Sequence, residues 1–386
     1  MLTSIEMVVF WLGLAGIAYA YVGYPLVVLL ISRLRPRPWQ RADHFPSVSI
    51  VIAARNEEKD IGAKLENTLE IDYPAEKLEI IVASDFSTDR TDEIVRSFEH
   101  RGVRLLRPER RLGKTAVQNL GVEHASGEIV VFSDATTYYN RDVLRRMLPN
   151  FADEKVGCVA GKLIYEDGTG SSVGRGASNY WSYETFLKEN ESLADSLIGV
   201  SGCLYAVRRS AYRPMYPEAC SDFLIATVVY RQGLRTVYEP SAVCTEETNV
   251  RGDQELKMRI RIVAQTLSDI WRNRDMLNPL RSGFFAVALV SHKLMRYAVP
   301  LLLAAIYAAS AVLAFSSMFF AGVFATQTVF WAIAALGLLL ERRNTDLGMF
   351  SFPAYFALAN LASLLGLYKF LKGETYSHWE PSRDTI

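Results

Sequence analysis

Three aspartates lie where the chain leaves or enters apolar segments. Asp85 and Asp134 each end an apolar run typical of a buried strand, and Asp222 lies further along, before the helical run Ile225–Arg231. In an open α/β sheet, ligands bind in the crevice at the carboxyl ends of the strands. Carboxylates gathered there can accept hydrogen bonds from a nucleotide, bind a divalent cation or take a proton from a hydroxyl. The three acids therefore indicate an acid-lined site for a charged small molecule.

The elements that must position these acids alternate along the chain from Ser47 onward. The sequence predicts strands at 48–54, 78–83, 103–106 and 129–132, and helices at 57–71, at 91–100 and from 115. Such alternation is typical of a parallel sheet covered by helices. The predicted fold class is therefore α/β.

Overall composition excludes some functions. Among 386 residues, 50% are hydrophobic and 22% charged, and the formal net charge is +0. A neutral chain has no general attraction for nucleic acid, which we do not expect as a partner. The cysteines fit no zinc pattern, so we expect free thiols at Cys158, Cys203, Cys220 and Cys244.

The sequence of the first 40 residues predicts a membrane anchor followed by a basic flank. The segment Met7–Ile31 is almost wholly apolar and about long enough to cross a bilayer as a helix. No small-residue cleavage site follows it, which favours a permanent anchor over a removed signal peptide. Basic residues come next, at Arg33, Arg35, Arg37 and Arg41, and the positive-inside rule then places residues 41–250 in the cytoplasm.

Residues 299–386 contain three further apolar stretches, Val299–Met318, Phe319–Leu340 and Met349–Leu371. Counting each as a span sends the C-terminus to the far side, although Lys369 and Lys372 oppose that placement. The chain is thus expected to be a multi-pass protein of the inner or plasma membrane.

Residues 251–298 form the connection between the domain and these stretches. Apolar residues recur at helical spacing in Gln254–Asp275, with lysines and arginines around them. This pattern fits a helix in the membrane interface or a helix packed on the domain core. Arg281–Tyr297 is a second boundary segment, which Ser291-His292-Lys293 makes too polar for a predicted span.

Four ordered motifs carry a resemblance to a known family. The segments Val48–Glu58, Ser84–Thr91, Gly113–Asn119 and Phe132–Thr137 resemble successive motifs of family 2 glycosyltransferases. The match covers about residues 47–271, and the flanking spans resemble those of the hyaluronan, cellulose and chitin-oligosaccharide synthases. The resemblance implies a nucleotide-binding GT-A domain between an N-terminal transmembrane helix and C-terminal interfacial and transmembrane helices.

The resemblance also implies roles for individual residues. Those expected at the nucleotide-sugar donor are Ala54, Asn56, Glu57, Asp85, Lys114, Ser133, Asp134 and Arg261. Asp134 would also bind Mg²⁺ or Mn²⁺, but Thr136 stands where the family's Asp-X-Asp pattern has its second acid. A helix-dipole position for Glu57 and a solvated basic loop for Lys114 are the alternatives.

Asp222 matches the family's general base, which takes the proton of the acceptor hydroxyl; a helix cap is the alternative. Gly202 and Trp181 are expected at the acceptor, with a turn and aromatic core packing as alternatives. Of the family's Gln-X-X-Arg-Trp motif, this chain has only the arginine, Arg261. Met258 stands at the glutamine position and Ile262 at the tryptophan position.

The resemblance implies an inverting enzyme that moves a sugar, most simply from a UDP-sugar, to a growing polysaccharide. Four spans are few for a polymer conduit, which suggests a homodimer or a partner subunit. Two alternatives remain open: single transfer to a membrane lipid or lipid-linked acceptor, and a nucleotide-sugar-binding membrane subunit without catalysis. The non-catalytic alternative is suggested by Thr136 at the second acid position and by the two replaced residues of the arginine motif.

Overall fold

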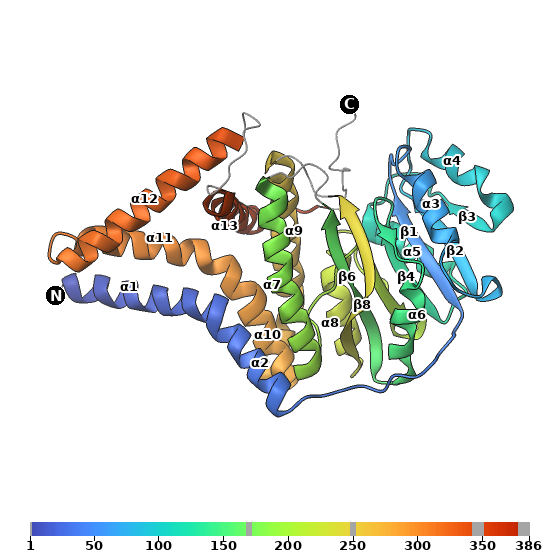
Figure 1. Ribbon diagram of the computed structural model, residues 1–386, viewed down its shortest axis with the longest axis horizontal. Helices are drawn as coiled ribbons and strands as arrows, with labels where there is room; N and C mark the ends of the chain where they lie inside the picture. The colour runs from blue at the N-terminus through green and yellow to red at the C-terminus, as the bar shows by residue number, and fades with distance from the viewer. Residues whose placement is uncertain (1, 167–171, 248–251, 342–350, 377–386) are drawn as a thin grey trace.

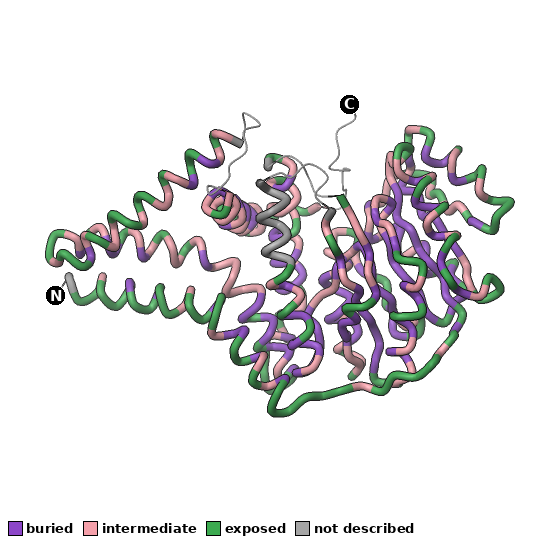
Figure 2. Tube along the Cα trace, viewed as in Figure 1, coloured by how far each residue is buried: buried purple, intermediate pink, exposed green. Residues whose placement is uncertain are grey.

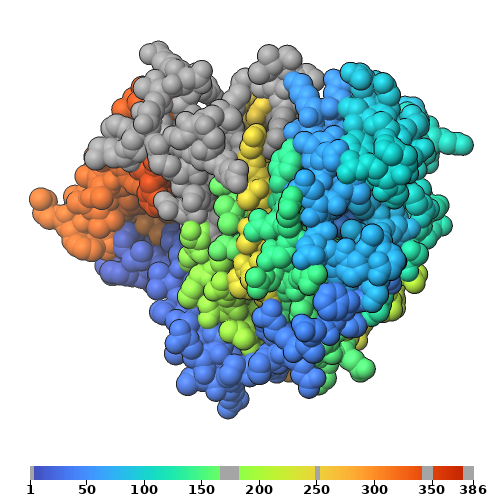
Figure 3. All heavy atoms as spheres, turned by 45° about the vertical axis from the view of Figure 1, so that its right-hand side comes forward, coloured from blue at the N-terminus to red at the C-terminus, as the bar shows by residue number. Residues whose placement is uncertain are grey.

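A computed structural model of the chain describes residues 2–166, 172–247, 252–341 and 351–376, without the side chains of residues 2–3, 166, 172–181, 252 and 341. An α/β domain forms one side of the molecule, and long apolar helices form the other (Figure 1). Figure 3 turns the α/β domain toward the viewer. Its first half is blue and cyan, and strand β8 is yellow and reaches the surface.

The domain is built on one mixed sheet in the order β3-β2-β1-β4-β7-β6-β8-β5. All seven residues of β1 are buried, as its continuous apolar sequence predicts for a strand covered on both faces. β1, β2, β3 and β4 are parallel, whereas β7 is antiparallel to both β4 and β6. The strand bounds are β1 Val48–Ala54, β2 Leu78–Ser84, β3 Val103–Leu106, β4 Ile129–Asp134, β5 Tyr138–Tyr139, β6 Val156–Glu166, β7 Leu204–Arg208 and β8 Arg235–Glu247. The predicted α/β class is confirmed.

Helices cover both faces because alternate strand residues form two separate cores. One core joins the sheet to α3 (Ile61–Leu69), α4 (Thr91–Ser97) and α6 (Val143–Met147). The other joins it to α5 (Lys114–Glu123) and α8 (Ser221–Tyr230). The strands are accordingly the most buried part of the molecule (Figure 2).

The strand order reverses at β1, and this reversal creates the crevice for a ligand. From β1 the chain runs to β2 and β3 on one side and then returns to β4 on the other. Such a switch point is where doubly wound sheets bind ligands. Asp134 ends β4 at this edge, so the topology supplies the crevice that the aspartate pattern predicted.

Within the described residues, four helical stretches are long and apolar enough to cross a membrane: Ser4–Leu34, Pro279–Leu313, Met318–Leu340 and Ser351–Leu371. The first combines α1 (Leu2–Ala18), a π-helical turn η1 (Tyr19–Gly23) and α2 (Tyr24–Leu34). The second combines α10 (Pro279–Ala288), the π-helical η7 (Leu289–Leu294) and α11 (Met295–Leu313). Many of their large apolar side chains are exposed, as lipid-facing residues are (Figure 2).

The second stretch includes Arg281–Tyr297, and the prediction that this segment lies at the membrane boundary stays a prediction. Its polar residues have partners inside the protein: the Tyr19 hydroxyl lies 2.8 Å from Ser291 Oγ, and His292 Nδ1 lies 2.7 Å from Glu191 Oε1. A polar residue is tolerated in a membrane helix when it faces such partners.

Two helices determine where the C-terminal segment lies. α9 (Gly252–Arg272) packs on the domain through Val263, Leu267 and Ile270, and α13 (Ser351–Leu371) lies along α9. Figure 1 shows α13 end-on, across the direction of α1 and α11. Beyond α13, the carbonyl of Tyr376 accepts a hydrogen bond from Gln265 Nε2 at 2.9 Å.

The C-terminal segment up to Tyr376 therefore lies beside the α/β domain. Counting spans placed this segment on the far side of the membrane; its side of the membrane stays a prediction, because α13 is long enough to cross but lies across the direction of α1 and α11. The remaining membrane helix, α12 (Met318–Glu341), runs between the far end of α11 and the domain side (Figure 1).

The basic flank after the first span is tied to the domain. Arg37 pairs with Asp195 at 2.6 Å and Arg41 with Glu239 at 2.5 Å. The flank is thus held against the domain by two ion pairs.

Candidate active site

A cavity of about 480 Å³ opens at the switch point and continues toward the membrane helices. Residues predicted from the sequence that line it are Glu57, Lys114, Asp134, Gly202, Asp222 and Arg261. They come from separate parts of the chain, which only the fold brings together.

Asp134 and Lys114 form the centre of the site. Lys114 Nζ lies 2.5 Å from Asp134 Oδ1, and each side chain is about one quarter exposed. Burial alone would lower the pKa of Lys114, but the carboxylates of Asp134 and Asp222 outweigh it and raise that pKa. Lys114 is therefore a fixed cation at the end of β4, where it can face a diphosphate.

Asp222 lies in the first turn of α8, with its two oxygens in different surroundings. Oδ1 accepts hydrogen bonds from the Cys220 thiol at 3.0 Å and the Phe223 amide at 3.1 Å. Oδ2 faces Gly202, where a Cβ added to the glycine would lie 3.3 Å from it and 3.5 Å from Lys114 Nζ. One oxygen is thus held by the protein and the other is directed at the space that Gly202 leaves open.

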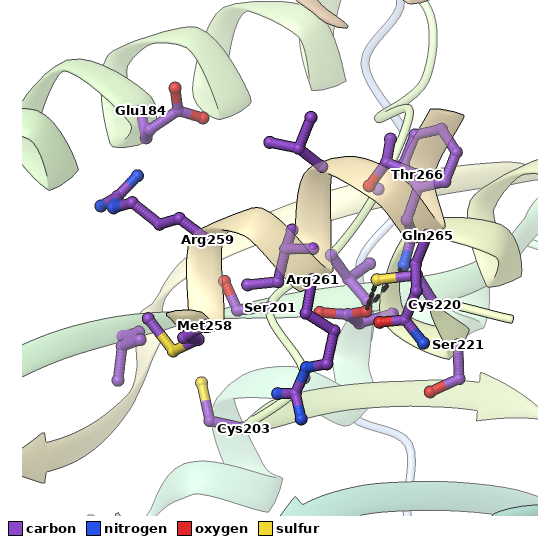
Figure 4. A pocket seen from close by; sticks show the side chains of 18 of the residues that line it. Glu184, Ser201, Cys203, Cys220, Ser221, Met258, Arg259, Arg261, Gln265 and Thr266 are labelled. Atoms are coloured by element: carbon purple, nitrogen blue, oxygen red, sulfur yellow. Dashed lines mark hydrogen bonds between the residues drawn. The ribbon is translucent and has the colours of Figure 1, made fainter. Parts of the chain in front are cut away.

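Arg261 extends from α9 into the same space, whereas Arg259 extends in another direction (Figure 4). Burial lowers the pKa of Arg261, while Cys220, Asp222 and Asp134 act in the opposite sense. Met258 and Ile262, which replace two residues of the family motif, also line the cavity. The motif's arginine therefore reaches the site without its usual neighbours.

Asp85 is not among the residues that line the cavity. It is fully buried, and its carboxylate accepts hydrogen bonds from the amides of Leu112 at 2.6 Å and Gly113 at 3.0 Å. Asp85 thus fixes the turn that begins α5 and presents Lys114. Contact between Asp85 and a nucleotide stays a prediction.

Three other predicted donor residues lie behind the cavity. Ala54 and Ser133 are fully buried in β1 and β4. Asn56 has a φ of 52° and its Oδ1 accepts from the Thr88 amide at 2.8 Å, so its side chain ties two turns together. Asp89 accepts from the Thr91 amide at 3.0 Å, at the start of α4.

Gly202 and Trp181 are the two residues expected at the acceptor. Gly202 lies between Asp222 and Lys114, and the absence of a side chain is what leaves room there. Trp181 belongs to α7 (Ser172–Ala194), but its side chain lies outside the described part. Tyr183 donates to the Tyr21 carbonyl at 3.1 Å, at the membrane end of the molecule.

The residues present fit a divalent cation only as a site shared with substrate. Asp134 is the carboxylate at the crevice, and Thr136 Oγ1 donates to Glu246 Oε1 at 3.0 Å on the cavity wall. No cluster of three or more His, Cys, Asp or Glu residues that could hold a metal ion occurs among the described residues. Magnesium-type ions commonly bind through one or two carboxylates together with water and substrate phosphates, and this donor set is of that kind.

Sequence reasoning missed the contacts that hold the loop before Asp222. Asp269 on α9 accepts from the Tyr216 hydroxyl and, at 2.9 Å, from the Cys220 amide. Gln265 donates to the Glu218 carbonyl at 3.2 Å. Helical spacing marked α9 as amphipathic, but no local signal could show that its polar residues hold this loop.

Asp269 should make stability depend on pH. Burial, opposed by its hydrogen bonds, raises the pKa of Asp269 from 3.8 to about 7. The folded chain then binds this proton more tightly than the unfolded chain, so stability falls as pH rises between these values. We expect Asp269→Asn to remove this decline, which melting temperatures measured from about pH 4 to pH 8 in detergent would show. Parallel curves for the two proteins would contradict it.

The comparisons with known proteins agree with this geometry. The family model for glycosyl transferase family 2 matches residues 49–215. A poly-beta-1,6-N-acetyl-D-glucosamine synthase from Staphylococcus aureus is 27% identical over 248 residues, covering 62% of this chain and 56% of that protein. The chain thus spans little more than half the length of that curated relative.

Two further similarities differ in extent. A beta-monoglucosyldiacylglycerol synthase from Nostoc is 30% identical over 154 residues, covering 38% of this chain and 31% of that protein. The solved structure of the mannosyltransferase PcManGT from Pyrobaculum calidifontis, in complex with GDP-Man and Mn²⁺, is 26% identical with a TM-score of 0.71. That match covers 97% of this chain and 100% of the other, so it includes the helices around the domain.

The motifs, the switch-point crevice and the family match identify the same region of the chain. Residues 49–215 of the chain thus form a domain that matches glycosyl transferase family 2.

Proposed function

We propose that the chain is a membrane-bound glycosyltransferase that moves a sugar from a nucleotide-sugar donor to the hydroxyl of a growing polysaccharide. The observation that carries this proposal is the convergence of Lys114, Asp134 and Asp222 around Gly202 in one cavity. A fixed cation and a carboxylate with one open oxygen are the two groups that the transfer needs.

In the proposed reaction, the acceptor hydroxyl attacks the anomeric carbon of the donor while Asp222 takes its proton. The bond from the anomeric carbon to the donor phosphate breaks, and the nucleoside diphosphate leaves with the bonding pair. Lys114 and Arg261 bind the diphosphate and offset its charge. A single displacement of this kind inverts the anomeric configuration.

Asp134, with the donor phosphates, would hold Mg²⁺ or Mn²⁺, and the cation would offset charge on the leaving diphosphate. The structural relative binds Mn²⁺. Glu57 lines the end of the cavity that would bind the donor. Asp85 supports donor binding indirectly, because it holds the turn that presents Lys114.

Single transfer to a lipid is a second candidate, favoured by one observation. The cavity is also lined by residues of the membrane helices, among them Tyr297 and Ser363. One relative is named as a synthase of a glucosyl diacylglycerol, whereas another is named as a polysaccharide synthase.

The decisive experiment supplies the purified chain in lipid nanodiscs with radiolabelled UDP- and GDP-sugars, with and without Mn²⁺. A product of many sizes supports polymer synthesis, and one lipid-soluble product of fixed size supports single transfer. Binding of a donor without release of its nucleotide, under every acceptor tested, would contradict both and support a non-catalytic subunit.

We further propose that the α/β domain and the C-terminal segment both face the cytoplasm of an inner or plasma membrane. Reporters fused after Gln40 and at the C-terminus should then read cytoplasmic, and one inserted near Ser316 should read the far side. The reason is that α13 packs along α9, which holds Tyr376 beside the domain. A C-terminal reporter on the far side would contradict this arrangement.

A further inference from the structure

A fully buried lysine lies behind the cavity, and the reaction proposed above does not use it. Lys64 belongs to α3, and its side chain has no contact with solvent. Taking an amine out of water is costly unless polar partners replace the water. Within the described residues, the partners of its Nζ are a backbone carbonyl and an aromatic ring, both in the segment that follows Asp134. The placement of Lys64 therefore calls for a role in holding that segment.

The hydrogen bond of Lys64 is short and does not require its charge. Its Nζ donates to the Thr137 carbonyl at 2.7 Å and lies 3.5 Å from the centre of the Tyr139 ring. Burial lowers the pKa of Lys64 from 10.5 to about 7, against the opposing effect of ionisable groups that include Asp134. The ammonium and the neutral amine both have N–H groups, so either form donates to Thr137. Because Thr137 is fully buried, water cannot replace Lys64 as this partner.

This hydrogen bond reaches Asp134 through a single turn. The Thr137 amide donates to the Asp134 carbonyl at 3.4 Å, while the Thr137 carbonyl accepts from Lys64. Asp134 also ends β4, where it lies beside Ala53 of β1. The backbone of Asp134 is thus held by the sheet before it and by Lys64, through Thr137, after it.

A second residue of α3 holds the same segment. Asn67 Nδ2 donates to the Tyr139 carbonyl at 2.9 Å, and Asn67 Oδ1 accepts from the Tyr139 amide at 2.8 Å. Lys64 and Asn67 are three residues apart, which places them on one face of the helix. That face of α3 therefore fixes the main chain of residues 137–139 by three hydrogen bonds.

Two effects of Lys64 on a cation bound at Asp134 would oppose each other. A nearby positive charge repels the cation, whereas a fixed turn keeps the Asp134 carboxylate in the position where it binds. The repulsion is the smaller effect, because the cation binds together with the donor diphosphate and their charges roughly cancel. Groups that orient a metal ligand commonly contribute about 10–100-fold to metal affinity. The positioning effect should therefore decide the outcome.

We propose that Lys64 and Asn67 are positioning residues for Asp134, and that they raise the affinity of the site for the divalent cation that Asp134 and the donor phosphates would hold. Neither side chain lines the cavity, so both act only through the segment after Asp134. This inference rests on the proposed function and adds to it the part of the fold that prepares the cation site.

The test titrates Mn²⁺ into the full chain in lipid nanodiscs and measures the binding of UDP and of GDP. Lys64→Met keeps a side chain of similar length but removes the donor to Thr137. It should need roughly tenfold more Mn²⁺ than wild type for half-maximal nucleotide binding. Nucleotide binding in EDTA should match that of wild type, because the variant leaves the cavity lining unchanged.

Lys77→Met is the matched control. Lys77 Nζ also donates to a backbone carbonyl at 2.7 Å, that of Phe45, but Lys77 precedes β2, at the opposite edge of the sheet from Asp134. This variant should have the Mn²⁺ requirement of wild type. Asn67→Ala should shift the requirement in the same direction as Lys64→Met, and it carries the test if Lys64→Met does not fold.

An unchanged Mn²⁺ requirement in Lys64→Met, or in Asn67→Ala where that variant carries the test, would overturn the proposal. An equal loss of nucleotide binding in Mn²⁺ and in EDTA would also overturn it, because that result indicates general damage to the domain. A shifted Mn²⁺ requirement in a chain that transfers no sugar would contradict the proposed function and still support this role of Lys64.

Discussion

Asp222→Asn should lower sugar transfer by roughly 10²–10⁴-fold, the usual contribution of a general base. An asparagine has the same shape, and its oxygen can still accept from Cys220 and Phe223. Its amide nitrogen would replace Oδ2 opposite Gly202 and cannot take a proton. The change acts on the transition state, so donor affinity should stay near that of wild type. Initial rates with labelled donor and titration with the donor measure the two effects.

Asp142→Asn provides the control, because Asp142 pairs with Arg146 on the surface of the domain, away from the cavity. That variant should keep wild-type rates, since surface ion pairs contribute little. Turnover of Asp222→Asn within a few-fold of wild type would show that Asp222 is a helix-cap residue and that the base lies elsewhere.

Asp134→Ala should abolish turnover and remove the dependence of donor binding on Mn²⁺. The variant loses the carboxylate at the crevice, and a hard cation then keeps only water and phosphate ligands. Lys114 also loses the partner that holds it at 2.5 Å, so the donor diphosphate meets a cation that is no longer fixed. Donor titrations with Mn²⁺ and with EDTA report this effect without relying on activity.

The metal dependence of wild type is the matched measurement. Donor affinity in wild type should fall when EDTA replaces Mn²⁺, and Asp142→Ala should show the same fall. If EDTA changes neither affinity nor rate in wild type, the site works without a divalent cation, and Lys114 with Arg261 supplies all the charge at the diphosphate.

The sequence alone determined the parts that depend on local pattern. Apolar runs bounded by turns predicted β1 to β4 within two residues, because strands buried on both faces have no room for polar side chains. Asp134 and Asp222 were found from strand and helix ends together with the family resemblance. Helix lengths were less predictable: α3 begins at Ile61, several residues after the predicted start, because Glu57 and Glu58 belong to the turn held by Thr91 and Asp89.

Only the tertiary structure decided which of these residues meet. Asp85 and Asp134 both end strands, yet the Leu112 and Gly113 amides engage Asp85 whereas Asp134 faces the cavity. Hydropathy described α13 as a span, but its packing along α9 returns Tyr376 to the domain. Asp269 carries no local motif, because its importance comes from partners far away in the chain. Long-range contacts of this kind are set by the packing of whole helices, which residue spacing does not encode.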